Sequence, residues 1–316
     1  MSAREEVVGM ENSFVAVTHD EHRRRGMAGM ELTAENISAL KALVYDRCHL
    51  SFPRGRESQL RRWFTQHAKE GQHRSFEDYY RAISTKDGEF ERLISLITTR
   101  ETYFFRMPEQ FDVLRGRVLP EIINGEGKRA MKALSRGESY RTNLRVWSAG
   151  CASGQETYSL AMQILATIRY AKAWDIRVLG TDINREGIEV AKTGRYERMR
   201  LGKTPPQMIE RYLEPRAASE VWVADEVKEI TDFQVLNLRD LPRMESFKNY
   251  FDIIFCRNVM IYFDLPAQQG LVSALSDCLR PGGYLFTGEG EVLHLYEHPL
   301  EIVEEGESIY YRKAEE

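Results

Sequence analysis

The sequence predicts an open α/β domain built on a mostly parallel sheet, with a smaller all-helical domain before it. Short apolar runs recur along the second half of the chain, each long enough for a buried strand and too short for a helix. Segments with helical periodicity separate these runs, which indicates βαβ units with right-handed crossovers. The predicted strands are residues 144–147, 176–179, 233–236, 253–256 and 284–287.

The part of the chain before the first strand has a helical pattern instead. Thr33 is a good helix N-cap, and apolar residues then recur every three or four positions. Further helices are predicted at residues 57–71, from Ser75 onwards and at 89–98. The predicted domains are therefore a loose extension at 1–29, a helical domain at 30–98 and an α/β domain at 99–316.

Within the α/β domain, the alternation of strands and helices breaks at residues 195–230. Two consecutive prolines open a short helix there, and residues 220–225 and 227–230 are predicted to pair as a small hairpin. An insertion of this size is seldom only a linker, so we predict a small binding subdomain. Near the end of the chain, residues 308–311 are predicted to form an edge strand.

Composition sets the broad class of protein. With 316 residues, 42% of them hydrophobic, the chain can bury a full core. A net charge of −4 excludes a globally basic nucleic-acid binder but leaves room for a local basic face. The four cysteines lie far apart without CxxC or zinc-like spacing, which indicates reduced thiols and no metal site. No apolar run approaches the ~18–20 residues of a membrane span, and the N-terminus lacks a signal-peptide core, so we expect a cytoplasmic protein without membrane insertion.

Two loops that follow predicted strands carry residues suited to a nucleotide-like ligand. The loop at 148–154 contains Gly150 and Gly154, which allow a close approach between backbone and ligand. It lacks the full GxGxxG spacing, so a pyrophosphate cradle is not the favoured interpretation. The second strand leads into Asp182, at the position where an acid holds ribose hydroxyls in nucleotide-binding sheets. Helix capping is the alternative role for Asp182.

Amide and cationic side chains follow the next two strands. Asn237 follows the third strand, and Arg257 and Asn258 follow the fourth. The carboxyl ends of parallel strands open on one edge of the sheet, where ligands bind. The four loops thus offer, in order, glycine, an acid, an amide, and an amide together with a cation. This set suits a ligand with a ribose and an adenine-like base but no pyrophosphate. S-adenosylmethionine is such a ligand.

Five motifs then resemble a known family, the chemotaxis receptor methyltransferases of the CheR type. These enzymes methylate glutamate side chains on bacterial chemoreceptors with S-adenosylmethionine, giving S-adenosylhomocysteine. The motifs are TTRETYFFR at 98–106, WSAGCASGQETYS at 147–159, GTDI at 180–183, FDIIFCRNVMIYFD at 251–264 and LRPGGYLF at 279–286. The resemblance runs in order from about residue 32 to 311. It implies a class I, Rossmann-like methyltransferase domain with a helical domain before it and a small β-hairpin subdomain inserted.

The resemblance also implies a set of cofactor contacts. Asp182 would hold the ribose hydroxyls, Glu156 would pair with the cofactor's ammonium group, and Asn237 with Leu238 would hold the adenine edge. The expected cofactor-binding residues are Arg100, Thr102, Arg106, Gly150, Glu156, Asp182, Asn237, Leu238, Arg257 and Asn258. Two of the matched residues are expected to act in catalysis. Arg106 supplies a fork that can orient a carboxylate, and Tyr262 lines the methyl-transfer pocket.

Three positions depart from the family pattern. Arg100 stands where the family usually has Asn, although an arginine there could still reach a carboxylate. The usual Gly-His-Ser-Glu after the fifth strand is Gly288-Glu289-Gly290-Glu291 here, so this loop is expected to carry extra negative charge near a site for an anionic substrate. Thr157 replaces the usual proline, a change expected to be benign.

The expected macromolecular partner is the helical cytoplasmic domain of a chemoreceptor. Four arginines cluster around a single acid and would form a basic face for an acidic helical substrate, although a solvated helix face is the alternative. These arginines are Arg54, Arg56, Arg61 and Arg62. Residues 214–220, at the place where some members dock a receptor's tethering peptide, lack the Gly-Gly pair of those members. We therefore expect a tether-independent, monomeric enzyme.

The expected reaction needs no general base. A glutamate side chain with a pKa of about 4.3 is already ionised near neutral pH and can attack the sulfonium methyl directly. Two alternatives stay open. A dehydrogenase of similar fold is disfavoured by the missing GxGxxG spacing. A non-catalytic S-adenosylmethionine sensor or scaffold is suggested by Arg100 and the acidic 288–291 loop.

Overall fold

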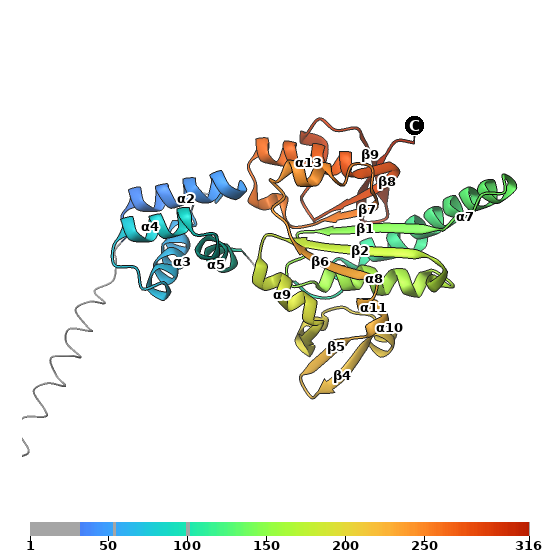
Figure 1. Ribbon diagram of the computed structural model, residues 1–316, viewed down its shortest axis with the longest axis horizontal. Coiled ribbons are helices and arrows are strands. Elements are labelled where there is room, and N and C mark those ends of the chain that lie inside the picture. Colours follow the sequence, from blue (N-terminus) through green and yellow to red (C-terminus); the bar gives the residue numbers. More distant parts are fainter. Residues whose placement is uncertain (1–31, 53–54, 99–101, 316) are drawn as a thin grey trace, which may run out of the picture. The chain divides into compact units, whose positions relative to one another are not determined.

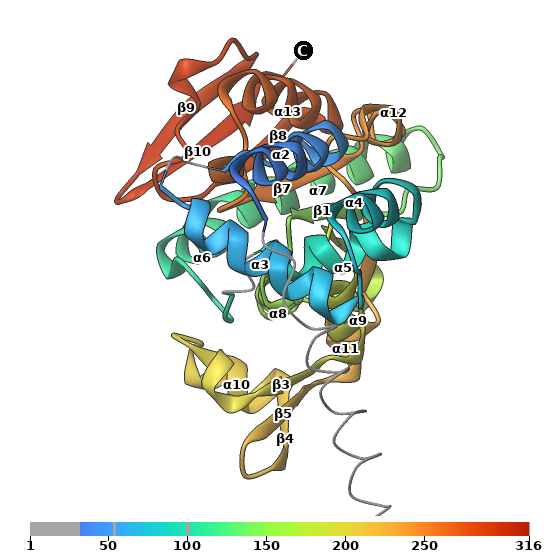
Figure 2. The same cartoon turned by 90° about the vertical axis from the view of Figure 1, so that its left-hand side faces the viewer.

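The computed structural model describes residues 32–52, 55–98 and 102–315, and these form two compact units (Figures 1 and 2). The helical unit contains the described residues up to Leu43 and those of Pro53–Ile97. The sheet unit contains Val44–Phe52 and the chain from Thr98 onwards. The expectations for residues 1–29, Arg54 and Arg100 lie outside the described residues.

The helical unit is built from helices with the predicted spacing of apolar residues. Thr33 caps the first by accepting a hydrogen bond from the Asn36 N–H at 3.2 Å, and Ser75 accepts one from the Asp78 N–H at 3.1 Å. The apolar faces meet in a core that includes Leu60 and Phe64, both fully buried. The helices are α2 (Ala34–Cys48), α3 (Glu57–Glu70), α4 (Phe76–Thr85) and α5 (Asp87–Ile97).

The main sheet of the other unit has seven strands in the order β6-β2-β1-β7-β8-β10-β9. The five strands from β6 to β8 are parallel, whereas β10 runs antiparallel to both of its neighbours. Strand order reverses at β1 and β7, which makes their carboxyl ends the topological switch point. The strands are β1 (Asn143–Ala149), β2 (Asp175–Asp182), β6 (Thr231–Val235), β7 (Phe251–Cys256), β8 (Leu279–Thr287), β9 (Leu300–Glu305) and β10 (Ser308–Lys313).

One strand prediction was wrong in its placement. Residues 308–311 form a strand, but β10 lies between β8 and β9 instead of at the edge. The edge strand is β9, whose sequence LEIVEE contains three glutamates. Charged residues suit an exposed edge, because they oppose pairing with another chain. The same charges hide the strand pattern in the sequence.

Helices cover both faces of the main sheet (Figure 1). Alternate strand residues point to opposite faces, so that Val146 joins the core beneath α8 (Gln155–Thr167) and α9 (Arg185–Thr193). Trp147 joins the other core, beneath α13 (Leu265–Cys278). The segment before β1, which the sequence analysis left unassigned, contains α6 (Pro108–Val113), a π-helical turn (Leu114–Val118) and α7 (Leu119–Ser135).

The inserted subdomain is a second, antiparallel sheet in the order β3-β5-β4, which lies apart from the main sheet (Figure 2). The proline pair opens α10 (Pro206–Tyr212) as predicted. The predicted hairpin was wrong, because residues 227–230 do not form its second strand. Asp225 and Glu226 instead begin the short helix α11 (Asp225–Lys228), where acids suit the helix N-terminus. The paired strands are β3 (Arg195–Glu197), β4 (Leu213–Ala217) and β5 (Glu220–Val223).

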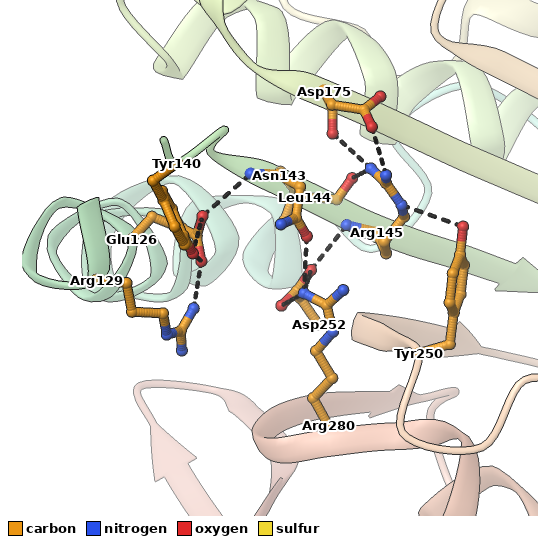
Figure 3. A network of polar contacts seen from close by, with 10 residues as sticks. All are labelled: Glu126, Arg129, Tyr140, Asn143, Leu144, Arg145, Asp175, Tyr250, Asp252 and Arg280. Atoms are coloured by element: carbon orange, nitrogen blue, oxygen red, sulfur yellow. Dashed lines mark hydrogen bonds and ion pairs between the residues drawn. The ribbon is translucent and has the colours of Figure 1, made fainter. Parts of the chain in front are cut away.

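Polar contacts tie the amino ends of the central strands together (Figure 3). The Asp252 carboxylate on β7 accepts hydrogen bonds from the Arg145 N–H at 2.8 Å and from Arg280 at 3.0 Å. Glu126 on α7 accepts one from the Asn143 N–H at 3.0 Å. This network lies at the opposite edge from the strand carboxyl ends, so it supports the sheet without entering the candidate site. No helix in the described part of the chain is long and apolar enough to span a membrane.

Candidate functional site

The loop after β1 packs directly against the loop after β7. Gly150 has a φ of +86°, and a Cβ added there would lie 2.2 Å from the Val259 Cγ2 atom. The N–H groups of Gly150 and Cys151 both donate to the Thr181 carbonyl oxygen, at 2.8 and 2.9 Å. Glycine is therefore needed at position 150 for loop-to-loop packing as well as for its backbone conformation.

Asp182 lies at the end of β2 with one backbone donor on each carboxylate oxygen. Its Oδ2 accepts from the Ala152 N–H and its Oδ1 from the Asn184 N–H, both at 2.8 Å. Burial raises the pKa of Asp182, and these backbone donors oppose that effect. Asn184 is the residue that caps α9, through the Gly187 N–H at 3.0 Å. Asp182 thus keeps lone pairs that can accept hydrogen bonds from a ligand.

Arg257 is part of a buried polar network behind the loops. Its side chain is 1% exposed, and its Nε donates to Glu156 Oε2 at 2.7 Å. One terminal nitrogen donates to the Arg106 carbonyl oxygen at 2.8 Å and to Gln110 Oε1 at 3.0 Å. The other oxygen of Glu156 accepts from the Ser148 hydroxyl at 2.7 Å. The network joins the ends of β1 and β7 to the segment that carries Arg106.

Both functional groups of the Asn237 side chain already have protein partners. Its amide nitrogen donates to the Arg47 carbonyl oxygen at 2.9 Å, and its oxygen accepts from the Arg239 N–H at 3.1 Å. The segment Val44–Phe52 is held further by a hydrogen bond from Tyr45 to Asp264 at 2.7 Å. The Ser51 N–H also donates to the Tyr262 carbonyl oxygen at 2.6 Å.

A pocket of about 650 Å³ lies beside this segment, within the sheet unit. It includes Leu238, the predicted neighbour of the adenine edge, and apolar side chains from α13. Its lining residues are Arg47, His49, Asn237, Leu238, Arg239, Asp240, Leu241, Pro242, Phe263, Pro266, Ala267, Gly270 and Leu271. The contribution of Val44–Phe52 could not be found from sequence, because no motif marks a contact between residues about 190 positions apart.

Thr102 and Arg106, two matched residues of the motif at 98–106, lie in the segment before α6. Thr102 is buried, and Phe105 is held in a left-handed conformation with its N–H donating to the Ser159 hydroxyl at 3.0 Å. Arg106 is half-buried, with its guanidinium carbon 6.0 Å from the centre of the Tyr103 ring. The half-buried Tyr262 ends a short 3-10 turn after β7.

The acidic loop after β8 contains one exposed and one buried glutamate. Glu289 is exposed, but Glu291 is only 6% exposed and its carboxylate accepts backbone hydrogen bonds. Burial raises the pKa of Glu291, and the backbone donors oppose that effect. The oxygens of Glu291 are thus used inside the protein, and Glu289 is the exposed acid of this loop, so the expected extra negative charge near the site stays a prediction.

The described arginines of the predicted substrate face all lie in the helical unit. Arg56 precedes α3, and Arg61 and Arg62 lie on the exposed side of that helix. Arg61 and Arg62 line a shallow surface depression together with Lys69, a further cation. The described part of this face is therefore basic and accessible within its own unit.

The order of the strands in the main sheet, with β10 antiparallel between β8 and β9, and the acid at the end of β2 fit a Rossmann-like S-adenosylmethionine-dependent methyltransferase domain, which is the fold class of this chain. Residues 35–98 match the family description "CheR methyltransferase, all-alpha domain", and residues 100–308 match "CheR methyltransferase, SAM binding domain". The chain belongs to the CheR methyltransferase family.

Curated relatives cover most of the chain. It is 32% identical to "Chemotaxis protein methyltransferase 1" of Pseudomonas aeruginosa, over 76% of this chain and 83% of that one. It is 32% identical to "Probable chemotaxis protein methyltransferase" of Rhizobium etli, over 71% and 81%. It is 28% identical to "Chemotaxis protein methyltransferase" of Borreliella burgdorferi, over 84% and 90%. Similarity over most of each chain supports a shared enzymatic activity.

Proposed function

We propose that this methyltransferase esterifies glutamate side chains on the helical cytoplasmic domain of chemoreceptors. The products are glutamate methyl ester and S-adenosylhomocysteine. The proposal rests on the match of both family domains in one chain. In addition, the loops at the carboxyl ends of the parallel strands carry the residues that the resemblance assigns to the cofactor. The relatives named as chemotaxis protein methyltransferases support the same substrate class.

In the proposed complex, bound S-adenosylmethionine supplies an electrophilic methyl group on a sulfonium. Asp182 accepts hydrogen bonds from the ribose hydroxyls, and Leu238 packs against the adenine next to Asn237. Gly150 and Asn258 shape the site through their backbone. Because both Glu156 oxygens already have partners, that carboxylate would hold the cofactor's ammonium group with its remaining lone pairs.

Arg257 acts indirectly in this proposal. Its buried guanidinium orients Glu156 and holds the carbonyl of Arg106, so it connects the two proposed contacts. The Arg106 fork then orients a carboxylate in a fixed geometry. Thr102 and the remaining cofactor contacts, including Arg100 outside the described residues, stay predictions from the resemblance.

The chemistry requires positioning more than proton transfer. The substrate carboxylate is ionised near neutral pH, so the protein has to align it with the methyl group and remove water from it. Tyr262 would line the pocket where this alignment occurs. The exposed arginines before and along α3 would attract the acidic receptor helix. We further propose that the enzyme needs no receptor tether, since residues 214–220, which run from β4 to the first residue of β5, contain no Gly-Gly pair. We also propose that it is a monomer.

The test is methyl transfer from radiolabelled S-adenosylmethionine to a receptor cytoplasmic fragment. The expected result is label that is released by mild alkali, as a carboxyl methyl ester requires. Receptor fragments with and without a C-terminal tether peptide should be labelled equally. Tight binding of S-adenosylhomocysteine with no transfer to any receptor fragment would instead support the sensor or scaffold alternative.

A further inference from the structure

We infer that Glu291 is a positioning residue of the active site, which holds the loop after β7 in the conformation that presents Asn258 and Tyr262. The inference rests on the proposed function, because the roles of those two residues do. It concerns a residue that touches neither reactant in the proposal. Its effect is transmitted through the backbone of the loop at 257–262.

The carboxylate of Glu291 joins the loops that follow β7 and β8. Its Oε2 accepts from the Asn258 N–H at 2.6 Å and from the Gly288 N–H at 2.8 Å. Its Oε1 accepts from the Ile261 N–H at 3.2 Å. One side chain therefore determines where the β7 loop leaves the strand and where its 3-10 turn (Met260–Tyr262) begins.

The backbone held by Glu291 has little freedom to relax. Asn258 has a φ of +58°, in the left-handed region that few non-glycine residues adopt. A Cβ on Gly288 would lie 2.4 Å from Glu291 Oε2 and 2.7 Å from the Asn258 N. In the same loop, Val259 packs against Gly150. The surroundings are close-packed, so a change in the carboxylate has to move the loop.

A carboxylate is the side chain that fits three backbone donors. It only accepts hydrogen bonds, whereas the amide of glutamine presents an N–H₂ group on one side. Depending on its orientation, the N–H₂ group would face either the N–H of Ile261 or the N–H groups of Asn258 and Gly288. In both cases two hydrogen-bond donors would oppose each other. Burying a charge is unfavourable unless hydrogen bonds compensate, and here three backbone groups do so.

The test compares Glu291→Gln and Glu291→Asp with the control Glu307→Gln, an exposed acid in the turn between β9 and β10. For each full-length variant, Tm, the Kd for S-adenosylhomocysteine, and the kcat and receptor KM of methyl transfer are measured. For Glu291→Gln we expect kcat to fall about tenfold to a hundredfold and the Kd to rise, with the receptor KM unchanged. Glu291→Asp keeps the charge but is one methylene shorter, so it should recover part of the loss. Glu307→Gln should match the wild type.

Two results would overturn the inference. One is a folded Glu291→Gln with wild-type kcat and Kd. The other is a loss of activity fully explained by a smaller folded fraction at the assay temperature, which would make Glu291 structural only. If Glu291→Gln does not fold, the kinetics of Glu291→Asp decide in the same way. If the wild type transfers no methyl group, the proposed function fails, while the Kd comparison still tests Glu291.

Discussion

Asp182 is the residue on which the proposed cofactor site depends most, because it joins two loops and still has lone pairs for the ribose. For Asp182→Ala we predict a tenfold to hundredfold rise in the Kd for S-adenosylhomocysteine. Hydrogen bonds made by a charged acceptor contribute about 1.5–3 kcal/mol, which corresponds to that range. Isothermal titration measures the change, with circular dichroism as the check on folding. The exposed Asp112→Ala is the matched control, and unchanged affinity in Asp182→Ala would place the ribose elsewhere.

Arg106 tests the proposed orientation of a carboxylate. Arg106→Lys keeps the charge and the backbone carbonyl that Arg257 holds, but it loses the two-pronged geometry. We predict that the variant loses most of its kcat while Tm stays near the wild-type value. Steady-state kinetics with a receptor fragment provide the measurement, and the exposed Arg115→Lys is the control. Near-normal kcat and cofactor affinity would make Arg106 a structural residue.

For individual residues, the sequence predicts which side chains lie at the same edge of the sheet, but not the hydrogen bonds and packing contacts between them. Asp182, Asn237 and Arg257 follow separate strands, and parallel strands bring their carboxyl ends to one edge. The burial of Glu291 and the contact between Asn237 and Arg47 depend on loops that pack across the fold. No local pattern carries that information.

Among the elements, α3 carries the described part of the proposed substrate face. Changing Arg54, Arg56, Arg61 and Arg62 together to Ser should raise the receptor KM and weaken its salt dependence, because exposed charges act mainly through long-range attraction. Cofactor affinity should not change. The matched control removes four exposed cations elsewhere, namely Lys128, Lys132, Arg136 and Arg141. Equal kinetics in the two quadruple variants at low and high salt would favour a solvated helix face.

The helical unit should also lose stability in mild acid through His67. Burial lowers the pKa of His67 below its usual 6.5, since the ring is 4% exposed and packs near Tyr79. The neutral ring therefore stabilises the fold above pH 6.5. As the pH falls below that value, the unfolded chain takes up the proton first. As the pH is lowered from about 7.5 through 6.5, the free energy of unfolding of this unit should therefore fall.

Hydrogen exchange of peptides from α3, α4 and α5 across this pH range measures this change in the full-length protein. His67→Leu should remove most of the pH dependence, whereas His294→Gln, at an exposed position outside the unit, should leave it intact. An equal pH dependence in wild type and His67→Leu would show that His67 does not cause the effect.

Strands and helices were predicted correctly where one local sequence pattern was strong. The prediction failed where two patterns in the same segment favoured different structures. Pure apolar runs such as Phe251–Cys256 were recognised as strands. The edge strand β9 was not predicted because of its glutamates, and β4 contains Pro215, a residue that is unfavourable inside strands. Residues 227–230 have strand-like side chains, but the acids before them favour a helix start.

For the whole molecule, alternating strands and helices were sufficient to predict the fold class, and the motifs were sufficient to indicate the family. The inclusion of Val44–Phe52 in the sheet unit was not predictable, because this segment continues a helix of the other unit. Long-range docking of that kind depends on tertiary contacts such as the hydrogen bond between Tyr45 and Asp264. The family match indicates the reaction, and these contacts show how this chain forms its candidate site.

The central claim is that this chain transfers a methyl group to glutamate carboxylates of a chemoreceptor. Tandem mass spectrometry of a receptor cytoplasmic fragment, after incubation with enzyme and S-adenosylmethionine, tests it most directly. The account predicts a mass gain of one methylene on specific glutamates, reversed by alkali and strongly reduced with the Asp182→Ala enzyme when S-adenosylmethionine is kept near its wild-type Kd. Methylation at nitrogen or at another side chain, or none on any receptor fragment by an enzyme that binds S-adenosylhomocysteine, would contradict it.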